Sequence, residues 1–195
     1  MSEILFLTNN DNTLELYEWI KEKTSAKLCT DRLTKEIIDD CMPKLIVSYN
    51  YKYIIPEDVI EYANCKIINM HISMLPWNRG SSPNLWSFIE NTPKGVTIHE
   101  LTKGLDKGAI IYQKEVSFDI QKDTLETSYN KLNAEITKLF KEHFDKLLLG
   151  DYDTYEQEGS GTYHTMKDYK AFSEKVDFNW TDRLDVFMEK VRSIK

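Results

Sequence analysis

The sequence predicts an α/β fold in which a mainly parallel sheet carries helices on both faces. The first observation is that short apolar runs alternate with helical patterns through the first half of the chain, as in sheets whose parallel strands are connected by helices. The second is that the first run, Ile4–Leu7, is wholly apolar, which is typical of a strand buried on both faces. The third is the length of 195 residues, which suffices for one domain with its own core.

Four strands are predicted in the first half of the chain. They are Ile4–Leu7, Ala26–Cys29, Leu45–Tyr49 and Lys66–His71. Helices are expected between them, one from Leu14 to about Lys23, one capped by Thr34 and stopped by Pro43, and one beginning at Pro56. In such a sheet, a site forms where strands reach their carboxyl ends.

Two further strands and a long helix are predicted in the second half. The strands are Gly95–Leu101 and Ala109–Val116, and the loop between them contains Asp106. The helix begins near Thr124, carries apolar side chains at helical spacing, and ends at Gly150.

Beyond residue 150 the pattern becomes more polar. A short strand is expected around Tyr155, with one or two helices near the end of the chain. We therefore predict a main domain over residues 1–150 and a short C-terminal extension over residues 151–195. The extension is too short to fold alone, so we expect it to pack on the main domain or on a second subunit, which makes a homodimer a reasonable expectation.

Charge and cysteine content narrow the class of protein. The formal net charge of −7 argues against a broad phosphate-binding surface, so no nucleic-acid partner is expected. The N-terminus resembles no signal peptide, and no apolar window approaches the roughly 18 residues of a membrane-spanning helix. Cys29, Cys41 and Cys65 are odd in number and widely spaced, which indicates reduced thiols and a cytoplasmic protein.

The most informative residues are Asn69 and His71, at the end of the fourth predicted strand. Residues two apart in a strand point to one face. A neutral imidazole takes up a proton near pH 7, and a protonated one stabilises a developing oxyanion. The Asn69 amide hydrogen-bonds without carrying charge, and Asp106 is a candidate to orient the imidazole. The alternative is that His71 has only local hydrogen bonds at the end of the strand, and that Asn69 and Asp106 shape turns. For His99, which alternates with apolar Ile98, a structural role is favoured.

Ordered motifs around these residues resemble the folate-dependent formyltransferase family. The motifs are Asn69-x-His71-x-Ser73-x-Leu75-Pro76, Arg79-Gly80, Pro83, Gly95-x-Thr97 and Gly104-Leu105-Asp106-x-Gly108. The resemblance runs from about Leu45 to Tyr112 and implies a Rossmann-like formyltransferase fold. It also implies N10-formyltetrahydrofolate as co-substrate and Asn69, His71 and Asp106 as the catalytic set. In that set, the His71 imidazolium and the Asn69 amide are the expected donors to the oxyanion, and Asp106 and His71 the expected proton carriers.

The resemblance further implies where the ligands bind. In related enzymes the pterin lies against the backbone of two loops, which correspond here to Tyr53, Ile54 and Ile55 and to Lys103, Gly104 and Leu105. The stretch from Pro76 to Trp86 resembles the amino-sugar formyltransferases of surface-glycan biosynthesis. Within it Trp77, Asn78, Arg79 and Asn84 are the expected contacts to the acceptor, a nucleotide-linked amino sugar.

Several alternatives remain open at this stage. The alternative acceptor is glycinamide ribonucleotide or another small amine of purine-type metabolism. A formyl-folate hydrolase and a non-catalytic binding protein on the same scaffold are the other candidates. No histidines and carboxylates have metal-ligand spacing, and no nucleotide-binding glycine motif is present, so we predict no metal and no ATP or nicotinamide cofactor.

Overall fold

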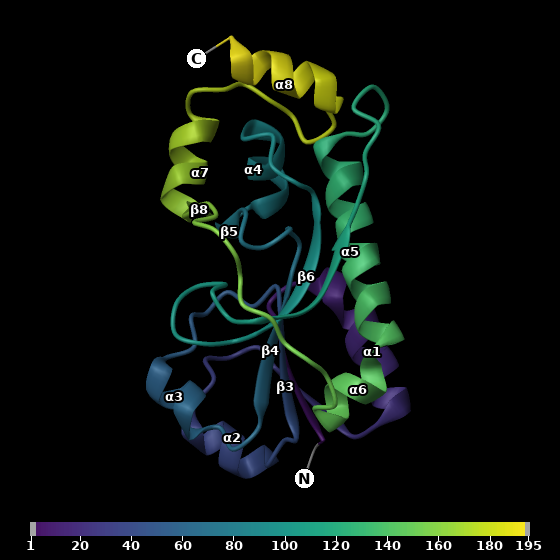
Figure 1. Ribbon diagram of the computed structural model, residues 1–195, viewed down its shortest axis with the longest axis vertical. Helices are drawn as coiled ribbons and strands as arrows, with labels where there is room; N and C mark the ends of the chain where they lie inside the picture. The colour runs from purple at the N-terminus through teal and green to yellow at the C-terminus, as the bar shows by residue number, and fades with distance from the viewer. Residues whose placement is uncertain (1–2, 194–195) are drawn as a thin grey trace. The chain divides into compact units, whose positions relative to one another are not determined.

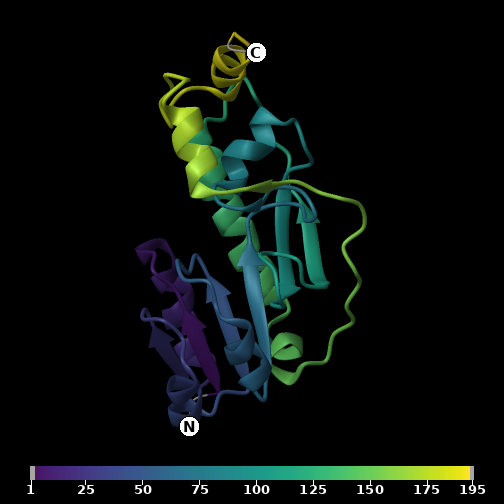
Figure 2. The ribbon, with the colours of Figure 1, turned by 90° about the vertical axis from the view of Figure 1, so that its left-hand side faces the viewer.

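Four parallel strands form the centre of one compact unit of the chain. The computed structural model describes residues 3–193, of which residues 3–71, 98–112 and 139–156 make up this unit. Its strands are β1 (Ile4–Leu7), β2 (Ala26–Cys29), β3 (Leu45–Tyr49) and β4 (Lys66–His71), which are the four runs that the sequence predicts. They pair in parallel in the order β2-β1-β3-β4, and Figure 2 shows them side by side in purple to blue.

Two more strands complete a six-stranded sheet of order β2-β1-β3-β4-β6-β7. They are β6 (Gly95–Glu100) and β7 (Ile110–Glu115), each one residue shorter at one or both ends than predicted. The Leu101 amide donates to the Ile67 carbonyl at 2.8 Å, which joins the end of β6 to β4. The predicted α/β fold with a mainly parallel sheet is therefore confirmed.

Helices cover both faces of the parallel strands, as predicted. In Figure 1, α2 (Lys35–Cys41) and α3 (Glu57–Tyr62) lie on one side of β3 and β4, and α1 (Leu14–Lys23) and α6 (Phe144–Leu149) lie on the other. A short 3-10 turn, Asp11–Thr13, leads into α1. The Thr34 hydroxyl accepts from the Ile37 amide and caps α2. Apolar side chains of β1, β3, α2 and α3 pack together, so burial of these side chains holds the helices on the sheet.

The prediction of one long helix up to Gly150 is wrong in one respect, because the helix is interrupted at His143. The structure has α5 (Leu125–Glu142) and then α6, with His143 between them at φ −113° and ψ 14°. The His143 ring stacks on Tyr112, with centroids 3.7 Å apart and planes 9° from parallel. The apolar spacing continues across the break, so the periodicity that predicts a helix does not reveal it.

The second compact unit is mainly helical. It comprises residues 72–97, 113–138 and 157–193 of the described chain. Its elements include β5 (Arg79–Gly80), α4 (Pro83–Ile89), β8 (Tyr163–His164), α7 (Met166–Ser173) and α8 (Leu184–Arg192). Its apolar cluster combines Leu85 and Phe88 of α4, Leu125 of α5, and Leu184 and Phe187 of α8. Figure 1 shows α4, α7 and α8 together at the top of the view.

The segment after residue 150 contains the two predicted terminal helices, α7 and α8. The predicted strand around Tyr155 is reduced to one antiparallel bridge with Ile110. The predicted boundary at residue 150 lies within the segment Leu139–Glu156 of the first unit, and the division into a main domain and an extension stays a prediction. Within residues 3–193, no helix is both long enough and apolar enough to cross a membrane.

Candidate active site

The three predicted catalytic residues lie together in the first unit. Asn69 is the fourth residue of β4 and His71 is its last, so both side chains leave the same face of the strand. Asp106 lies in the loop between β6 and β7. His71 and Asp106 are buried, at 7% and 9% exposure, and Asn69 is half-buried. Burial strengthens the electrostatic interactions among these groups.

Asp106 is the centre of a hydrogen-bonded cluster. The Asn69 Nδ2 group donates to Asp106 Oδ1 at 3.2 Å. His71 Nδ1 lies 3.7 Å from Asp106 Oδ2, so a protonated His71 would form an ion pair with this carboxylate. The structure therefore brings together one amide, one imidazole and one carboxylate, which can exchange protons and stabilise charge.

His99 is a fourth member of this cluster, although the sequence favours a structural role for it. It lies on β6, is 1% exposed, and its Nε2 atom is 3.2 Å from Asn69 Nδ2 and 3.6 Å from Asp106 Oδ1. Its Nδ1 atom is 2.8 Å from the Glu100 carbonyl oxygen. A signal for His99 existed in its alternation with buried Ile98, but the pairing of β6 with β4 is what brings it to Asn69.

The hydrogen bonds of His99 assign the orientation of the Asn69 amide. Because Nδ1 faces a carbonyl oxygen, it carries the proton in a neutral imidazole, and Nε2 is then an acceptor. The Asn69 nitrogen therefore faces His99 and Asp106, to which it donates. The Asn69 oxygen is the atom left to accept a hydrogen bond from a ligand.

The loop that carries Asp106 is shaped by two backbone features. Asp106 has φ +53°, in the left-handed region that aspartate tolerates better than most residues. Gly108 follows two residues later, and a Cβ there would lie 1.7 Å from the Glu100 carbonyl oxygen. Only glycine fits at this close approach of backbone to backbone. The same Glu100 carbonyl accepts from His99, so Gly108 lets the loop lie against the residue that fixes the His99 ring.

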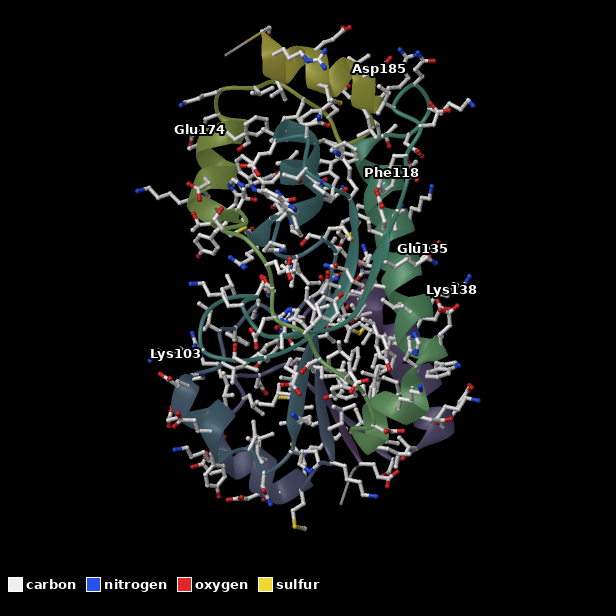
Figure 3. The ribbon with its side chains drawn as sticks, in the orientation of Figure 1. Lys103, Phe118, Glu135, Lys138, Glu174 and Asp185 are labelled. Atoms are coloured by element: carbon white, nitrogen blue, oxygen red, sulfur yellow. The ribbon has the colours of Figure 1, made fainter. Side chains whose placement is uncertain are left out.

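The two segments predicted to bind folate both belong to the first unit, and an ion pair holds the second of them to the start of α3. Lys103 lies in the loop before Asp106, and its Nζ atom is 2.8 Å from Glu57 Oε2 at the start of α3. Figure 3 shows Lys103 beside α3. Ile54 and Leu105 are 75% and 41% exposed, whereas Ile55 is buried. Gly104 has φ +95° and Tyr53 is half-buried. Binding of folate by these residues stays a prediction.

Asn78 and Asn84, which were predicted to contact the acceptor, have buried side chains that are used within the second unit. The Asn78 amide donates to Glu90 at 3.1 Å and accepts from the Thr92 hydroxyl at 2.7 Å. Asn84 Nδ2 donates to the Leu125 carbonyl at 3.1 Å, and its Oδ1 atom accepts from Ser128 at 3.1 Å. These internal bonds favour a structural role for both asparagines.

Trp77 and Arg79 are both half-buried and remain candidates for acceptor binding. The Arg79 guanidinium donates to Gln157 Oε1 at 2.7 Å and to the Ser160 carbonyl at 3.2 Å. This contact ties the loop after β4 to the segment before β8, both in the second unit. Trp86 is buried and stacks on His164, with ring centroids 3.9 Å apart. It also lies against Phe172, which packs on the apolar cluster of this unit.

No metal centre is apparent in the part of the chain that the structure describes. Among residues 3–193, no group of three or more histidine, cysteine or acidic side chains is arranged to hold a metal ion. The absence of a metal stays a prediction.

Comparison with known proteins gives a consistent match. The family model described as "Formyl transferase" matches residues 11–143. The dTDP-4-amino-4,6-dideoxyglucose formyltransferase of Mycobacterium bovis is 30% identical over 150 residues, which cover 77% of this chain and 62% of that protein. The methionyl-tRNA formyltransferase of Thermodesulfovibrio yellowstonii is 34% identical over 122 residues, or 62% of this chain and 39% of that protein. This chain thus spans less than two thirds of the length of the curated relatives it matches.

A solved structure matches over nearly the whole of both chains. The formyltransferase PseJ of Anoxybacillus kamchatkensis, crystallised with UDP-4,6-dideoxy-4-formamido-L-AltNAc and tetrahydrofolate, is 38% identical. The match covers 96% of this chain and 98% of that chain, with a TM-score of 0.84. A protein of Mycobacterium tuberculosis described as a "likely sugar N-formyltransferase" has a TM-score of 0.81 at 25% identity, and the match covers 100% of this chain and 88% of that one.

Proposed function

This chain belongs to the formyl transferase family, and we propose that it transfers a formyl group from N10-formyltetrahydrofolate to the primary amine of a nucleotide-linked amino sugar. The observation that carries the proposal is the cluster of Asn69, His71 and Asp106, in which His71 and Asp106 are buried. The choice of acceptor is supported by the similarity to PseJ, whose structure holds a formamido sugar nucleotide and tetrahydrofolate.

His71 and Asp106 supply the acid–base chemistry that the transfer needs. The folate co-substrate supplies the activated formyl group, and the acceptor amine loses a proton as it adds to the formyl carbon. Asp106, a carboxylate beside His71, is the acceptor for that proton, directly or through one water. The bond from the formyl carbon to N10 of the folate then breaks, and N10 takes up the proton held by Asp106 and leaves as tetrahydrofolate. A protonated His71, held by Asp106 through Nδ1, directs Nε2 toward the formyl oxygen, which becomes negative.

The hydrogen bonds of Asn69 support a role different from the one that the resemblance implies. Its nitrogen donates to Asp106 and His99, so its oxygen accepts an N–H of the incoming amine rather than the amide nitrogen donating to the oxyanion. An acceptor at this position orients the amine lone pair toward the formyl carbon. Ser73 takes no part, because its hydroxyl donates to the Trp77 carbonyl at 2.8 Å.

A direct transfer assay tests the proposal. The protein is incubated with N10-formyltetrahydrofolate and a panel of nucleotide-linked amino sugars, and each sugar is examined by mass spectrometry for the gain of one CO. We expect formylation of at least one 4-amino-4,6-dideoxy sugar nucleotide. His71→Ala should abolish the transfer and keep tetrahydrofolate binding. Hydrolysis of the donor with no formylated amine would instead support a formyl-folate hydrolase, and formylation of glycinamide ribonucleotide alone would overturn the acceptor class. The cytoplasmic location and the homodimer stay predictions.

A further inference from the structure

A pocket in the first unit lies between the start of α2 and the segment from the loop after β3 to the start of α3. Its volume is about 350 Å³, within the range of small-molecule sites. Leu33 and Val59, which are buried, and Ile54, which is 75% exposed, supply apolar walls. Ile54 also belongs to one of the segments predicted to bind folate, so the pocket continues directly from that predicted site.

Arg32 places one cation in the wall of this pocket, and Lys52 places a second one near it, on the Tyr53 ring that Arg32 also contacts. Arg32 lines it, and its Cζ atom is 4.8 Å from the centroid of the Tyr53 ring. Lys52 Nζ is also 4.8 Å from that centroid. Arg32 Cζ and Lys52 Nζ are therefore at most twice that distance apart. Within residues 3–193, neither cation has an ion pair with a carboxylate.

The neighbouring cations are already neutralised. Lys35 forms an ion pair with Asp58 at 2.8 Å, and Lys103 forms one with Glu57 at 2.8 Å. Arg32 and Lys52 therefore leave a local excess of positive charge in a chain whose net charge is −7. Such an excess attracts an anion that the rest of the surface would repel. Two carboxylates also line the pocket, those of Glu36 and Asp58. Asp58 is paired with Lys35, so Glu36 is the one that opposes the excess.

We propose that this pocket binds the glutamyl tail of the folate co-substrate, with Arg32 and Lys52 pairing with the carboxylates of the tail. The inference rests on the proposed function, because the tail extends from a pterin lying against Tyr53, Ile54 and Ile55. The methylene groups of the tail pack against Ile54. Each additional γ-linked glutamate adds one carboxylate, so the attraction increases with the length of the tail. The protein thus selects polyglutamylated folates over the monoglutamate.

The test compares the dissociation constants of monoglutamyl and pentaglutamyl 5-formyltetrahydrofolate, measured by calorimetry on the full chain. We expect the pentaglutamate to bind about tenfold more tightly at low salt, and the ratio to approach one near 0.5 M salt because screening removes exposed charge pairs. Arg32→Gln and Lys52→Gln should each reduce the ratio about threefold. Glu36→Gln should increase it, because it removes the opposing charge.

Arg192→Gln is the matched control, since it makes the same charge change on an exposed residue of α8. A ratio of one in the unaltered protein, or equal effects of Arg32→Gln and Arg192→Gln, would overturn the proposal. So would a loss of the ratio on adding UDP or dTDP at low, constant ionic strength, because the pocket would then hold the phosphates of the acceptor. If formyl transfer proceeds without any chain-length preference, the proposed function stands and only this inference fails. If no folate binds, both fail.

Discussion

At the level of single residues, His99 sets which end of the Asn69 amide faces a ligand. Replacing His99 by Leu removes the acceptor for Asn69 Nδ2, and loss of a buried hydrogen-bond partner costs about 1–3 kcal/mol. We expect kcat to decrease about tenfold to a hundredfold, with a smaller change in KM for the folate. Steady-state kinetics of formyl transfer measures both.

His99→Gln serves as the control for that change, because a glutamine oxygen can accept from Asn69. It should recover much of the kcat that His99→Leu loses, without restoring a titratable group. If the Leu and Gln variants were equally slow, His99 would act through its ring and not as an acceptor for Asn69.

Asp106 is the residue whose replacement should affect the chemical step most. Asn in its place tolerates the backbone at φ +53°, so the fold is retained while the carboxylate is lost. General acid–base groups contribute about 10²–10⁴-fold, and we expect kcat of Asp106→Asn to fall by about 10³-fold. Unchanged circular dichroism together with unchanged kcat would remove Asp106 from the mechanism.

The sequence predicts part of this site, and the reason is the period of a strand. Asn69 and His71 are two apart in β4, which places them on one face. No spacing rule connects either residue to His99, which is 30 residues further along the chain from Asn69. That contact depends on the register between strands, which local pattern does not specify. Asn78 and Asn84 show the opposite case, because a polar residue in a loop does not reveal that its side chain is bonded internally.

At the level of elements, α7 has an N-terminal capping box. The Thr165 hydroxyl accepts from the Asp168 amide at 3.2 Å, and Asp168 Oδ2 accepts from the Thr165 amide at 2.7 Å. Thr165→Ala should lower the free energy of unfolding by about 1 kcal/mol, and Thr165→Ser should lower it much less. Urea denaturation followed by circular dichroism measures both.

The same capping box should respond to acid. Hydrogen bonds from Thr165 lower the pKa of Asp168 in the folded protein. The stabilisation is therefore present above the ordinary aspartate pKa and is lost as the pH falls through the folded value. The difference in stability between Thr165→Ala and the unaltered protein should shrink below about pH 4. A difference that stays constant from pH 7 to about pH 3 would contradict this role for the Asp168 carboxylate.

Two glycines before β8, Gly159 and Gly161, allow the cost of backbone strain to be measured apart from the cost of a steric clash. Gly159 and Gly161 both have positive φ, at +84° and +62°, but only at Gly161 would a Cβ clash, at 2.1 Å from the Pro76 carbonyl oxygen. Gly159→Ala should cost about 1–2 kcal/mol, the penalty for a left-handed alanine. Gly161→Ala should cost a further 1–3 kcal/mol or so, because the segment must move off Pro76. Equal losses in thermal denaturation would show that the contact with Pro76 adds nothing.

At the level of the whole molecule, the thiols should be unreactive while the protein is folded. Cys29 and Cys41 are buried, and burial raises the pKa of the Cys29 thiol and raises that of Cys65 to about 11. The thiolate is the reactive form. We therefore expect slow labelling of Cys29 and Cys65 by iodoacetamide at pH 7.5 and complete labelling in denaturant, as measured by mass spectrometry of peptides. Rapid labelling of Cys65 in the native protein would contradict the raised pKa of this half-buried thiol.

Prediction from the sequence succeeds best for β1 to β4 and their helices, where apolar runs and helical spacing alternate without ambiguity. It is weaker for the second unit. The two-residue strands β5 and β8 pair across more than 80 residues, and no local pattern indicates such a short pairing. The break at His143 is missed for a related reason, because ring stacking on Tyr112 involves residues far apart in sequence.

The order in which the chain is synthesised has a different consequence for each unit. The last segment of the first unit ends at Glu156, so that unit can complete its contacts while later residues are still being added. The apolar cluster of the second unit needs Leu184, Phe187 and Val191. During synthesis, Leu85 and Phe88 of α4 therefore lack their partners from α8 until nearly the whole of the remaining chain has been made. This interval exposes apolar surface, and exposed apolar surface attracts chaperones and promotes aggregation. A chain arrested after Gly161 should accordingly be held by a chaperone through α4, whereas one extended beyond Val191 should be released.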